Sequence, residues 1–184
     1  MSLKFAILGF LALDATSGYT LQQRFDASVS SFWSVTQSQI YRELKDLERD
    51  GWVCSEIVPG HGRPARNVYS VTPRGTAALQ QWLREPVEPQ QIRHPLLLKL
   101  AFSGLSDPAV GSTLLEEYHA ELGVVEASYQ DRAGAAEIFG HARTSREALI
   151  WQLILENGLS WVRAERAWAA RAIGVWKEET RETE

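Results

Sequence analysis

Polar side chains recur on one side of residues 36–50, and their chemistry is that of hydrogen-bond donors and cations. Ser38, Arg42, Lys45 and Arg49 lie three or four positions apart, which is the spacing of one face of an α-helix. Side chains near the start of such a helix suit contacts with base edges in a DNA major groove, whereas Lys45 and Arg49 suit phosphate contacts. The pattern therefore predicts a helix with a DNA-binding face.

The same stretch carries the signals that hold this helix in place. Thr36 is a suitable N-cap, and Gly51 suits the left-handed conformation that ends a helix. Ile40, Leu44 and Leu47 form an apolar stripe on the opposite side. We predict that the helix packs on a core through this stripe.

Elements on both sides complete a recognisable arrangement. The apolar run 5–13 predicts a first helix, and a turn at residues 16–18 precedes a second helix that begins near Tyr19. Downstream, residues 52–57 and 67–71 have the pattern of strands, and the segment between them is rich in glycine, proline and arginine. Three helices followed by a two-stranded hairpin with a basic loop predict a winged helix-turn-helix.

Ordered motifs along the chain resemble the PadR family of transcriptional regulators. In the first half they are Ile7-Leu8-Gly9, Ser17-Gly18-Tyr19, Ser38-Gln39-Ile40-Tyr41, Asp50-Gly51 and a wing from Gly62-Arg63-Pro64 through Arg66-Asn67-Val68-Tyr69 to Thr72-Pro73-Arg74-Gly75. In the second half they are the segment 94–102 and the late segment with Gly158, Leu159 and Trp168. The resemblance covers almost the whole chain and points to the branch that includes phenolic-acid-responsive repressors. It implies binding to an operator in double-stranded DNA and release by a small effector, often aromatic.

The candidate DNA-binding residues combine the helix pattern with this resemblance. They are Tyr19, Thr36, Gln37, Ser38, Gln39, Tyr41, Arg42, Lys45, Arg63 and Arg66. Asn67 stands where family wings often carry a lysine, which leaves Arg63 and Arg66 as the basic groups of the wing.

The second half of the chain predicts a helical dimerisation domain. Residues 85–89 form a proline-spaced linker, and helices are expected over 94–105, from 107 onward and over 145–178. In the last helix mostly apolar residues recur for about seven turns: Ile150, Leu153, Ile154, Asn157, Trp161, Ala164, Trp168, Ala172 and Val175. Such a long stripe exceeds what a small domain buries internally. We therefore expect a mainly α protein with a small β-hairpin, in which residues 1–85 bind DNA and residues 90–184 form the homodimer.

The resemblance also implies an effector pocket, near the junction of the two domains or at the dimer interface. Apolar walls with a few polar anchors are typical of such pockets. The candidate wall residues are Leu98, Phe102 and Trp151, with His94 or His119 as a polar anchor.

The charge distribution bears on whether the partner of the winged helix is DNA or a protein. The 184 residues carry a net charge of −4, but residues 1–85 hold nine Lys/Arg against eight Asp/Glu, and residues 86–184 hold ten against fifteen. The wing region 59–74 has three arginines and no acid, so a local basic patch is expected. The overall acidity keeps open a winged-helix module that binds a protein rather than DNA. A MarR-type regulator is another alternative, although it expects dimerisation helices on both sides of the winged helix.

Other residue types argue against catalysis and membrane association. The four histidines have no metal-ligand spacing with Cys54 or the carboxylates, and the chain has no phosphate-binding glycine loop or nucleophile motif. We expect no enzyme activity, cofactor or metal, and we expect Cys54 to be buried in its strand. A single cysteine and the absence of an apolar run of membrane-spanning length predict a cytoplasmic protein with no membrane partner.

Overall fold

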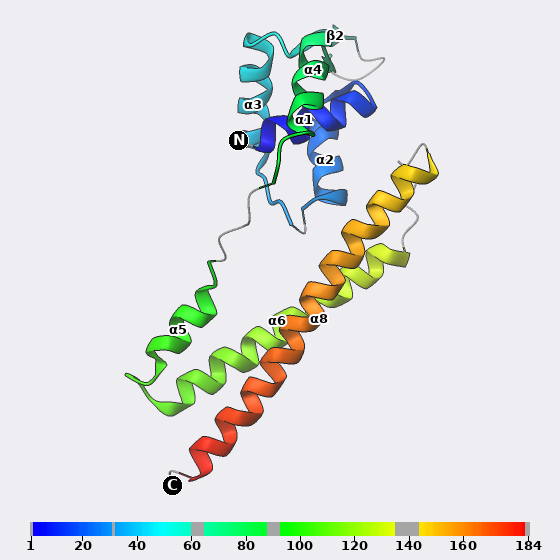
Figure 1. Ribbon diagram of the computed structural model, residues 1–184. Coiled ribbons are helices and arrows are strands. Elements are labelled where there is room, and N and C mark those ends of the chain that lie inside the picture. The colour runs from blue at the N-terminus through cyan, green and yellow to red at the C-terminus, as the bar shows by residue number, and fades with distance from the viewer. Residues whose placement is uncertain (1, 31, 60–64, 88–92, 135–143, 183–184) are drawn as a thin grey trace. The chain divides into compact units, whose positions relative to one another are not determined.

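The computed structural model of the protein describes residues 2–30, 32–59, 65–87, 93–134 and 144–182. The chain divides into two compact units, Met1–Pro89 and Gln90–Glu184, and each is described by itself (Figure 1). No helix among the described residues has both the length and the apolar character needed to cross a membrane.

The first unit is a winged helix-turn-helix. Its elements follow in the order α1 (Ser2–Leu13), β1 (Thr16–Ser17), α2 (Gly18–Ser28), α3 (Gln37–Arg49), β2 (Val53–Val58), β3 (Arg66–Val71) and α4 (Pro73–Trp82). The three strands form an antiparallel sheet in the order β1-β3-β2. The predicted mainly α fold with a small β-hairpin is therefore confirmed, with one strand added to the hairpin.

The added strand lies where the sequence predicted only a turn. Thr16 and Ser17 pair with Tyr69 and Val68 of β3. Ser17 also caps α2, because its hydroxyl accepts a hydrogen bond from the backbone N–H of Thr20 at 3.2 Å. A two-residue strand leaves no periodic pattern in a sequence, and its formation depends on the distant β3.

The core of this unit is built by the apolar faces of α1, α2 and α3. Side chains with no exposed surface gather there, namely Ile7, Leu8, Leu21, Phe25, Ile40 and Leu44. Helix α4 meets the start of the hairpin at Gly75, where an added Cβ would collide with the carbonyl oxygen of Trp52. Thr72 caps α4 and donates its hydroxyl proton to the Gly51 carbonyl at 2.8 Å.

The prediction that Cys54 is buried is wrong. In β2 only Val53 is buried, and Cys54 is exposed, with its Sγ 3.8 Å from the carbonyl oxygen of Ser70. The physical reason is that β2 is an edge strand of the sheet. After Val53 this strand extends beyond the core, so the side chains that follow face solvent.

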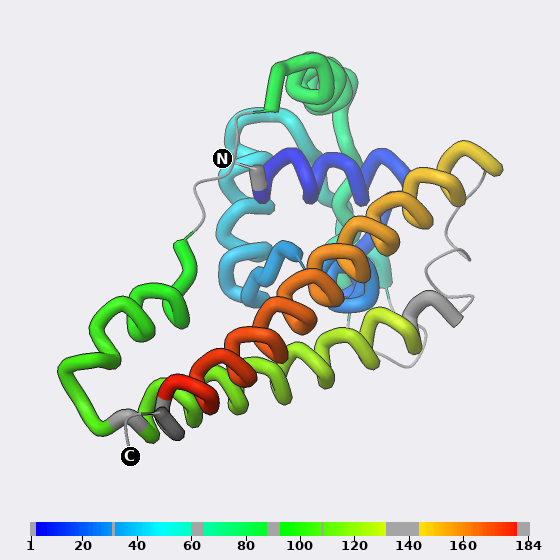
Figure 2. The backbone as a smooth tube through the Cα atoms, turned by 60° about the horizontal axis from the view of Figure 1, so that its bottom comes forward, coloured from blue at the N-terminus to red at the C-terminus, as the bar shows by residue number. Residues whose placement is uncertain are grey.

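The second unit consists of helices α5 (Pro95–Ser103), α6 (Pro108–Gly134) and α8 (Ser145–Glu182). Helices α6 and α8 lie side by side and run antiparallel (Figures 1 and 2). Their contact buries Leu122, Tyr129, Leu155 and Val162. Gly158 lets the Tyr129 ring approach the α8 backbone, where a Cβ would collide with it.

An ion-pair cluster adds to the contact between α6 and α8. Glu126 of α6 accepts hydrogen bonds from Arg163 at 2.9 Å and from Arg166 at 2.8 Å. The hydrogen bonds from Arg166 and then Arg163 hold the pKa of the Glu126 carboxyl below its usual value. The carboxylate stays ionised, and the pairing fixes the register of the two helices at this point.

Candidate nucleic-acid interface and effector pocket

Helix α3 begins with a complete capping box. The Thr36 hydroxyl accepts from the backbone N–H of Gln39 at 3.4 Å, and the Gln39 side-chain oxygen accepts from the backbone N–H of Thr36 at 2.8 Å. This reciprocal pair satisfies two of the free donors at a helix start. Gly51, with a φ of 72°, follows the other end of the helix. Local side chains therefore define both ends of α3.

The outer face of α3 presents the predicted polar residues to solvent. Gln37, Ser38, Arg42 and Lys45 are all exposed, and Ile40, Leu44 and Leu47 on the inner face are buried. Within the part of the chain that the structure describes, Arg42 and Lys45 have no ion-pair partner. Their positive charges are thus free for an external anion.

Bonds within the domain engage two of the side chains that the sequence predicted to contact DNA. Arg49 pairs with Asp46 at 2.7 Å and lies 3.5 Å from Asp50, so its charge is compensated within the helix end. The Gln39 oxygen is engaged in the cap, which leaves mainly its amide nitrogen for an outside partner. The Ser38 hydroxyl lies 3.1 Å from the Thr36 hydroxyl, whereas the exposed side chains of Gln37 and Arg42 take no part in these local bonds.

The two candidate tyrosines occupy different environments beside α3. Tyr41 lies over the start of α2, because a Cβ added at Gly18 would be only 2.7 Å from its ring. Tyr19 is 60% exposed, and its hydroxyl accepts from the Gln23 amide at 3.2 Å. Tyr41 thus packs α3 against α2 and still shows part of its ring, whereas Tyr19 is open to solvent.

The structure describes one of the two arginines predicted for the wing. Arg66 is exposed and opposes Val58 at the far end of the β2–β3 pair. Arg63 lies outside the described residues. The hairpin therefore carries at least one cation beyond the domain core.

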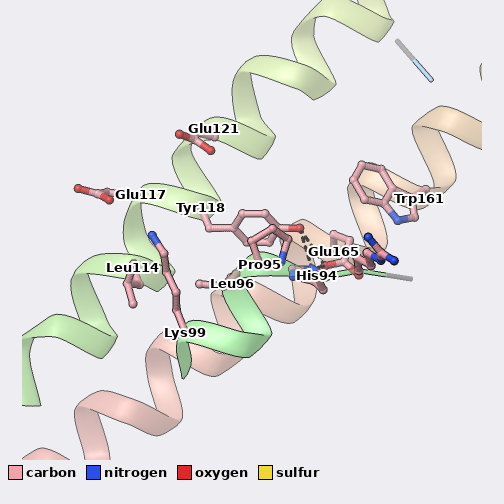
Figure 3. A pocket seen from close by; sticks show the side chains of 11 residues that line it. His94, Pro95, Leu96, Lys99, Leu114, Glu117, Tyr118, Glu121, Trp161 and Glu165 are labelled. Atoms are coloured by element: carbon pink, nitrogen blue, oxygen red, sulfur yellow. Dashed lines mark hydrogen bonds and ion pairs between the residues drawn. The ribbon is translucent and has the colours of Figure 1, made fainter. Parts of the chain in front are cut away.

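A cavity of about 830 Å³ opens in the second unit between the start of α5, the middle of α6 and the middle of α8 (Figure 3). Apolar walls come from Pro95, Leu96 and Leu114, and aromatic walls from Tyr118 and Trp161. The charged side chains in its lining are Arg93, Lys99, Glu117, Glu121 and Glu165. The cavity thus combines an apolar body with polar anchors, as small-molecule sites do.

Three polar side chains from three segments meet in this cavity. The Tyr118 hydroxyl donates to Glu165 Oε2 at 3.2 Å, and His94 Nε2 lies 3.2 Å from the same hydroxyl and 3.5 Å from Glu165 Oε2. His94 also caps α5, since its Nδ1 accepts from the Leu97 N–H at 3.4 Å. In the neutral ring this bond assigns the proton to Nε2, which then faces the other two groups.

The Tyr118 hydroxyl keeps its proton throughout the neutral range. Burial, followed by the negative charge of Glu165, raises its pKa to about 12. Tyr118 is therefore a donor to Glu165 rather than a competing anion.

The four predicted effector residues do not share one site. His94 lines the large cavity, whereas Leu98 and Phe102 line a neighbouring hollow with Lys99, Val110 and Leu114. Trp151 does not belong to the described lining of either. The alternative anchor His119 is also outside both linings.

The sequence pattern did not single out Glu165 or Tyr118, and it placed Trp161 in the apolar stripe of the last helix. These residues are far apart in the chain, and they meet only because α6 and α8 pair in one register. A helical wheel of the last helix would place Glu165 beside the Trp161 position, and this was the one available signal.

A winged helix-turn-helix with an exposed basic recognition helix, followed by a long helical hairpin, defines a class of DNA-binding transcriptional regulators. The model of the transcriptional regulator PadR-like family matches residues 7–81, and the model of the virulence activator alpha C-terminal domain matches residues 92–177. The negative transcriptional regulator PadR of Bacillus subtilis is 30% identical over 173 residues, covering 87% of this chain and 93% of that protein. The chain belongs to the PadR family of transcriptional regulators.

Three further likenesses were found, one in sequence and two in fold. A probable transcriptional regulator of Mycobacterium tuberculosis is 45% identical over 89 residues, which is 48% of this chain and only 47% of that protein. The crystal structure of Bacillus subtilis PadR in complex with operator DNA has a TM-score of 0.82 at 24% identity and covers 96% of this chain and 99% of that one. The same Bacillus protein in complex with p-coumaric acid has a TM-score of 0.75, with 24% identity and coverage of 95% of both chains.

Proposed function

We propose that this chain is a homodimeric, effector-responsive repressor that binds a pseudo-palindromic operator through α3 and the wing. The observation that carries the proposal is the outer face of α3, where Arg42 and Lys45 are exposed and have no ion-pair partner among the described residues, on a helix capped at both ends. Side chains at the start of such a helix contact base edges, and those further along contact phosphate. We assign Gln37, Ser38 and Arg42 to bases, and Thr36 and Lys45 to phosphate.

The remaining candidates extend this interface. Arg66 and Arg63 of the wing are assigned to phosphate or to the minor groove, where arginine is favoured. The exposed Tyr19 is assigned to phosphate through its hydroxyl, and Tyr41 mainly positions α3 on α2. Residues 1–85 form the DNA-binding domain in this proposal.

Dimerisation is assigned to residues 90–184. Helix α8 buries Leu155, Val162 and Ala169 in the single chain, yet Ile150, Leu153 and Val175 of its predicted stripe stay about half exposed or more. A row of exposed apolar side chains on a long helix is typical of a subunit interface. A dimer would carry two α3 helices to successive major grooves, about one helical turn apart.

The cavity around His94 is the proposed effector site, and Leu98 and Phe102 in the adjacent hollow extend it. Bacillus PadR has been solved both with operator DNA and with p-coumaric acid, so one relative binds both kinds of partner. The effector must bind one arrangement of the dimer more tightly than the other in order to release DNA. We infer that the protein acts by binding alone, without catalysis, and in the cytoplasm, where its operator lies.

Selection of duplex DNA from a random pool by the purified protein, at two salt concentrations, tests the proposal. We expect an inverted repeat with half-sites about ten base pairs apart, and affinity that falls steeply with salt because phosphate contacts release counterions. Recovery of no sequence by a folded, dimeric protein would favour the alternative, a winged-helix module that binds a protein.

Arg42→Ala tests the assignment of α3 against a selected operator. We expect a loss of about 1–3 kcal/mol of binding free energy, with thermal stability unchanged because the Arg42 side chain is exposed. Arg84→Ala, which removes an arginine at an exposed position after α4, is the matched control. Equal operator affinity of Arg42→Ala and the unmodified protein would refute the assignment.

A further inference from the structure

The electrostatics of the cavity indicate what kind of small molecule it accepts. Three carboxylates line it, from Glu117, Glu121 and Glu165, against the two cations Arg93 and Lys99. Arg93, Lys99, Glu117 and Glu121 are all exposed, whereas the Glu165 side chain is only 27% exposed. The most enclosed charge of the lining is therefore negative.

Only one of the two oxygens of the Glu165 carboxylate is contacted by the described part of the protein. Both of its neighbours, the Tyr118 hydroxyl and His94 Nε2, approach Oε2. Within the described residues, Oε1 has no hydrogen-bond partner, and no lysine or arginine nitrogen lies within the 4.0 Å of an ion pair. Tyr118 is a neutral donor, and His94 forms an ion pair with Glu165 at 3.5 Å only when both of its ring nitrogens carry protons. The hydrogen bond from the Leu97 N–H to Nδ1 favours the singly protonated ring, which leaves the negative charge of Glu165 without a cationic partner among the described residues. An enclosed, unbalanced carboxylate favours a cation or a strong hydrogen-bond donor.

Aromatic rings adjoin this carboxylate in the cavity lining. Tyr118 bonds to Glu165 directly, and Trp161 lies one turn earlier on α8 with 53% of its surface exposed. Figure 3 shows both rings beside Glu165. Aromatic faces attract ammonium groups and also stack on aromatic ligands. The site thus offers an anionic oxygen and two π surfaces to the same ligand.

We propose that the effector of this chain is an aromatic amine, bound with its ammonium group on Glu165 Oε1 and its ring against Tyr118 and Trp161. This inference rests on the proposed effector-responsive function and names its ligand class. A carboxylate-bearing phenol such as p-coumaric acid would place a second negative charge in a cavity that already has an excess of carboxylates. The chemistry of the lining therefore separates this chain from a regulator that responds to phenolic acids.

Three para-substituted phenols provide the test, and their side arms are cationic, neutral and anionic; tyramine and 4-ethylphenol share a saturated two-carbon arm, whereas p-coumaric acid carries a longer unsaturated one. Binding of tyramine, 4-ethylphenol and p-coumaric acid to the full-length protein is measured by calorimetry at neutral pH. We expect tyramine to bind at least tenfold more tightly than 4-ethylphenol, and p-coumaric acid to bind most weakly. Preference for p-coumaric acid or for the neutral phenol would overturn the proposal.

Two variants locate the binding. Glu165→Gln keeps the shape and the Tyr118 contact but removes the charge, and we expect it to lower tyramine affinity tenfold or more. Trp161→Leu leaves the Tyr118–Glu165 bond intact and should lower it severalfold. Glu156→Gln, the same charge removal at an exposed position of α8 outside the cavity lining, is the matched control and should change affinity less than twofold. Equal effects of Glu165→Gln and Glu156→Gln would show that only the overall charge matters and would overturn the assignment of Oε1.

Operator binding is measured on the same preparations. If tyramine binds as predicted but no operator is found, the ligand assignment stands and the regulatory function fails. If an operator is found and tyramine does not bind, the ligand class is wrong while the proposed function stands.

Discussion

At the scale of single residues, Tyr118 shows how position in the fold sets chemistry. Its phenol is ordinary in sequence, yet burial and the neighbouring Glu165 raise its pKa to about 12. The folded state therefore holds this proton more tightly than the unfolded chain, in which a tyrosine ionises near pH 10. By linkage, the resulting contribution to stability is complete below pH 10 and is lost as the pH rises toward 12.

Absorbance of tyrosinate during an alkaline titration checks this shift. We expect one of the five tyrosines to ionise with a pKa of about 12, and we expect this late step to vanish in Tyr118→Phe. Tyr19→Phe, which removes an exposed tyrosine, is the control and should leave the late step in place. A late step that persists in Tyr118→Phe would show that another tyrosine is the perturbed one.

Gly75 is a second residue whose position in the fold determines its type, because a side chain does not fit there. Its α-carbon faces the Trp52 carbonyl, and any Cβ would collide with that backbone oxygen. We expect Gly75→Ala to lower the free energy of unfolding by about 1–3 kcal/mol, the usual cost of overpacking. Urea denaturation measures this, and Gly9→Ala, where a Cβ meets nothing within 4 Å, is the control. Equal unfolding free energies of Gly75→Ala and Gly9→Ala would mean that α4 moves to accommodate the added methyl group without loss of stability.

At the scale of elements, the sequence predicted those features that depend on nearby residues. Thr36 was identified as a cap, and the structure confirms it, because a cap needs only a hydroxyl and the next three residues. The apolar stripe of α3 was equally local. By contrast, β1 and the meeting of Tyr118 with Glu165 depend on segments far apart in the chain. The outward position of Cys54 depends on β2 being an edge strand, which alternation alone does not reveal.

The cap of α3 supports a prediction that links stability to DNA binding. Thr36→Ala removes the acceptor for the Gln39 N–H and should cost about 0.5–2 kcal/mol of unfolding free energy. It also frees the helix start that carries Gln37 and Ser38, so operator affinity should fall as well. Thr36→Ser keeps the hydroxyl and should restore both quantities. Thermal denaturation and operator titration measure the two effects, and failure of Thr36→Ser to restore them would show that the methyl group matters instead.

At the scale of the whole molecule, the acidic residues are concentrated in the second half of the chain, where fifteen Asp/Glu face ten Lys/Arg over residues 86–184. Residues 1–85 are close to neutral, so a single copy has few charges with which to bind DNA. In the proposed dimer, affinity comes from two copies acting on one operator, because joining two weak contacts multiplies their effect. This proposal makes the helical unit as important for DNA binding as α3 itself.

Substitutions in the apolar stripe of α8 test whether DNA affinity depends on dimerisation. Leu153 is 55% exposed in the single chain, and we assign it to the subunit interface. Leu153→Asp should place a charge in that interface and convert the dimer to a monomer, which light scattering after size-exclusion chromatography detects. Operator affinity should fall by about 10²-fold or more as the second half-site contact is lost. Gln152→Asp adds the same charge at the preceding exposed position and should leave both mass and affinity unchanged. A Leu153→Asp protein that remains dimeric with full affinity would move the interface off this stripe, and the exposed side chains of α5 (Leu97, Leu98, Phe102) would become the next surface to test.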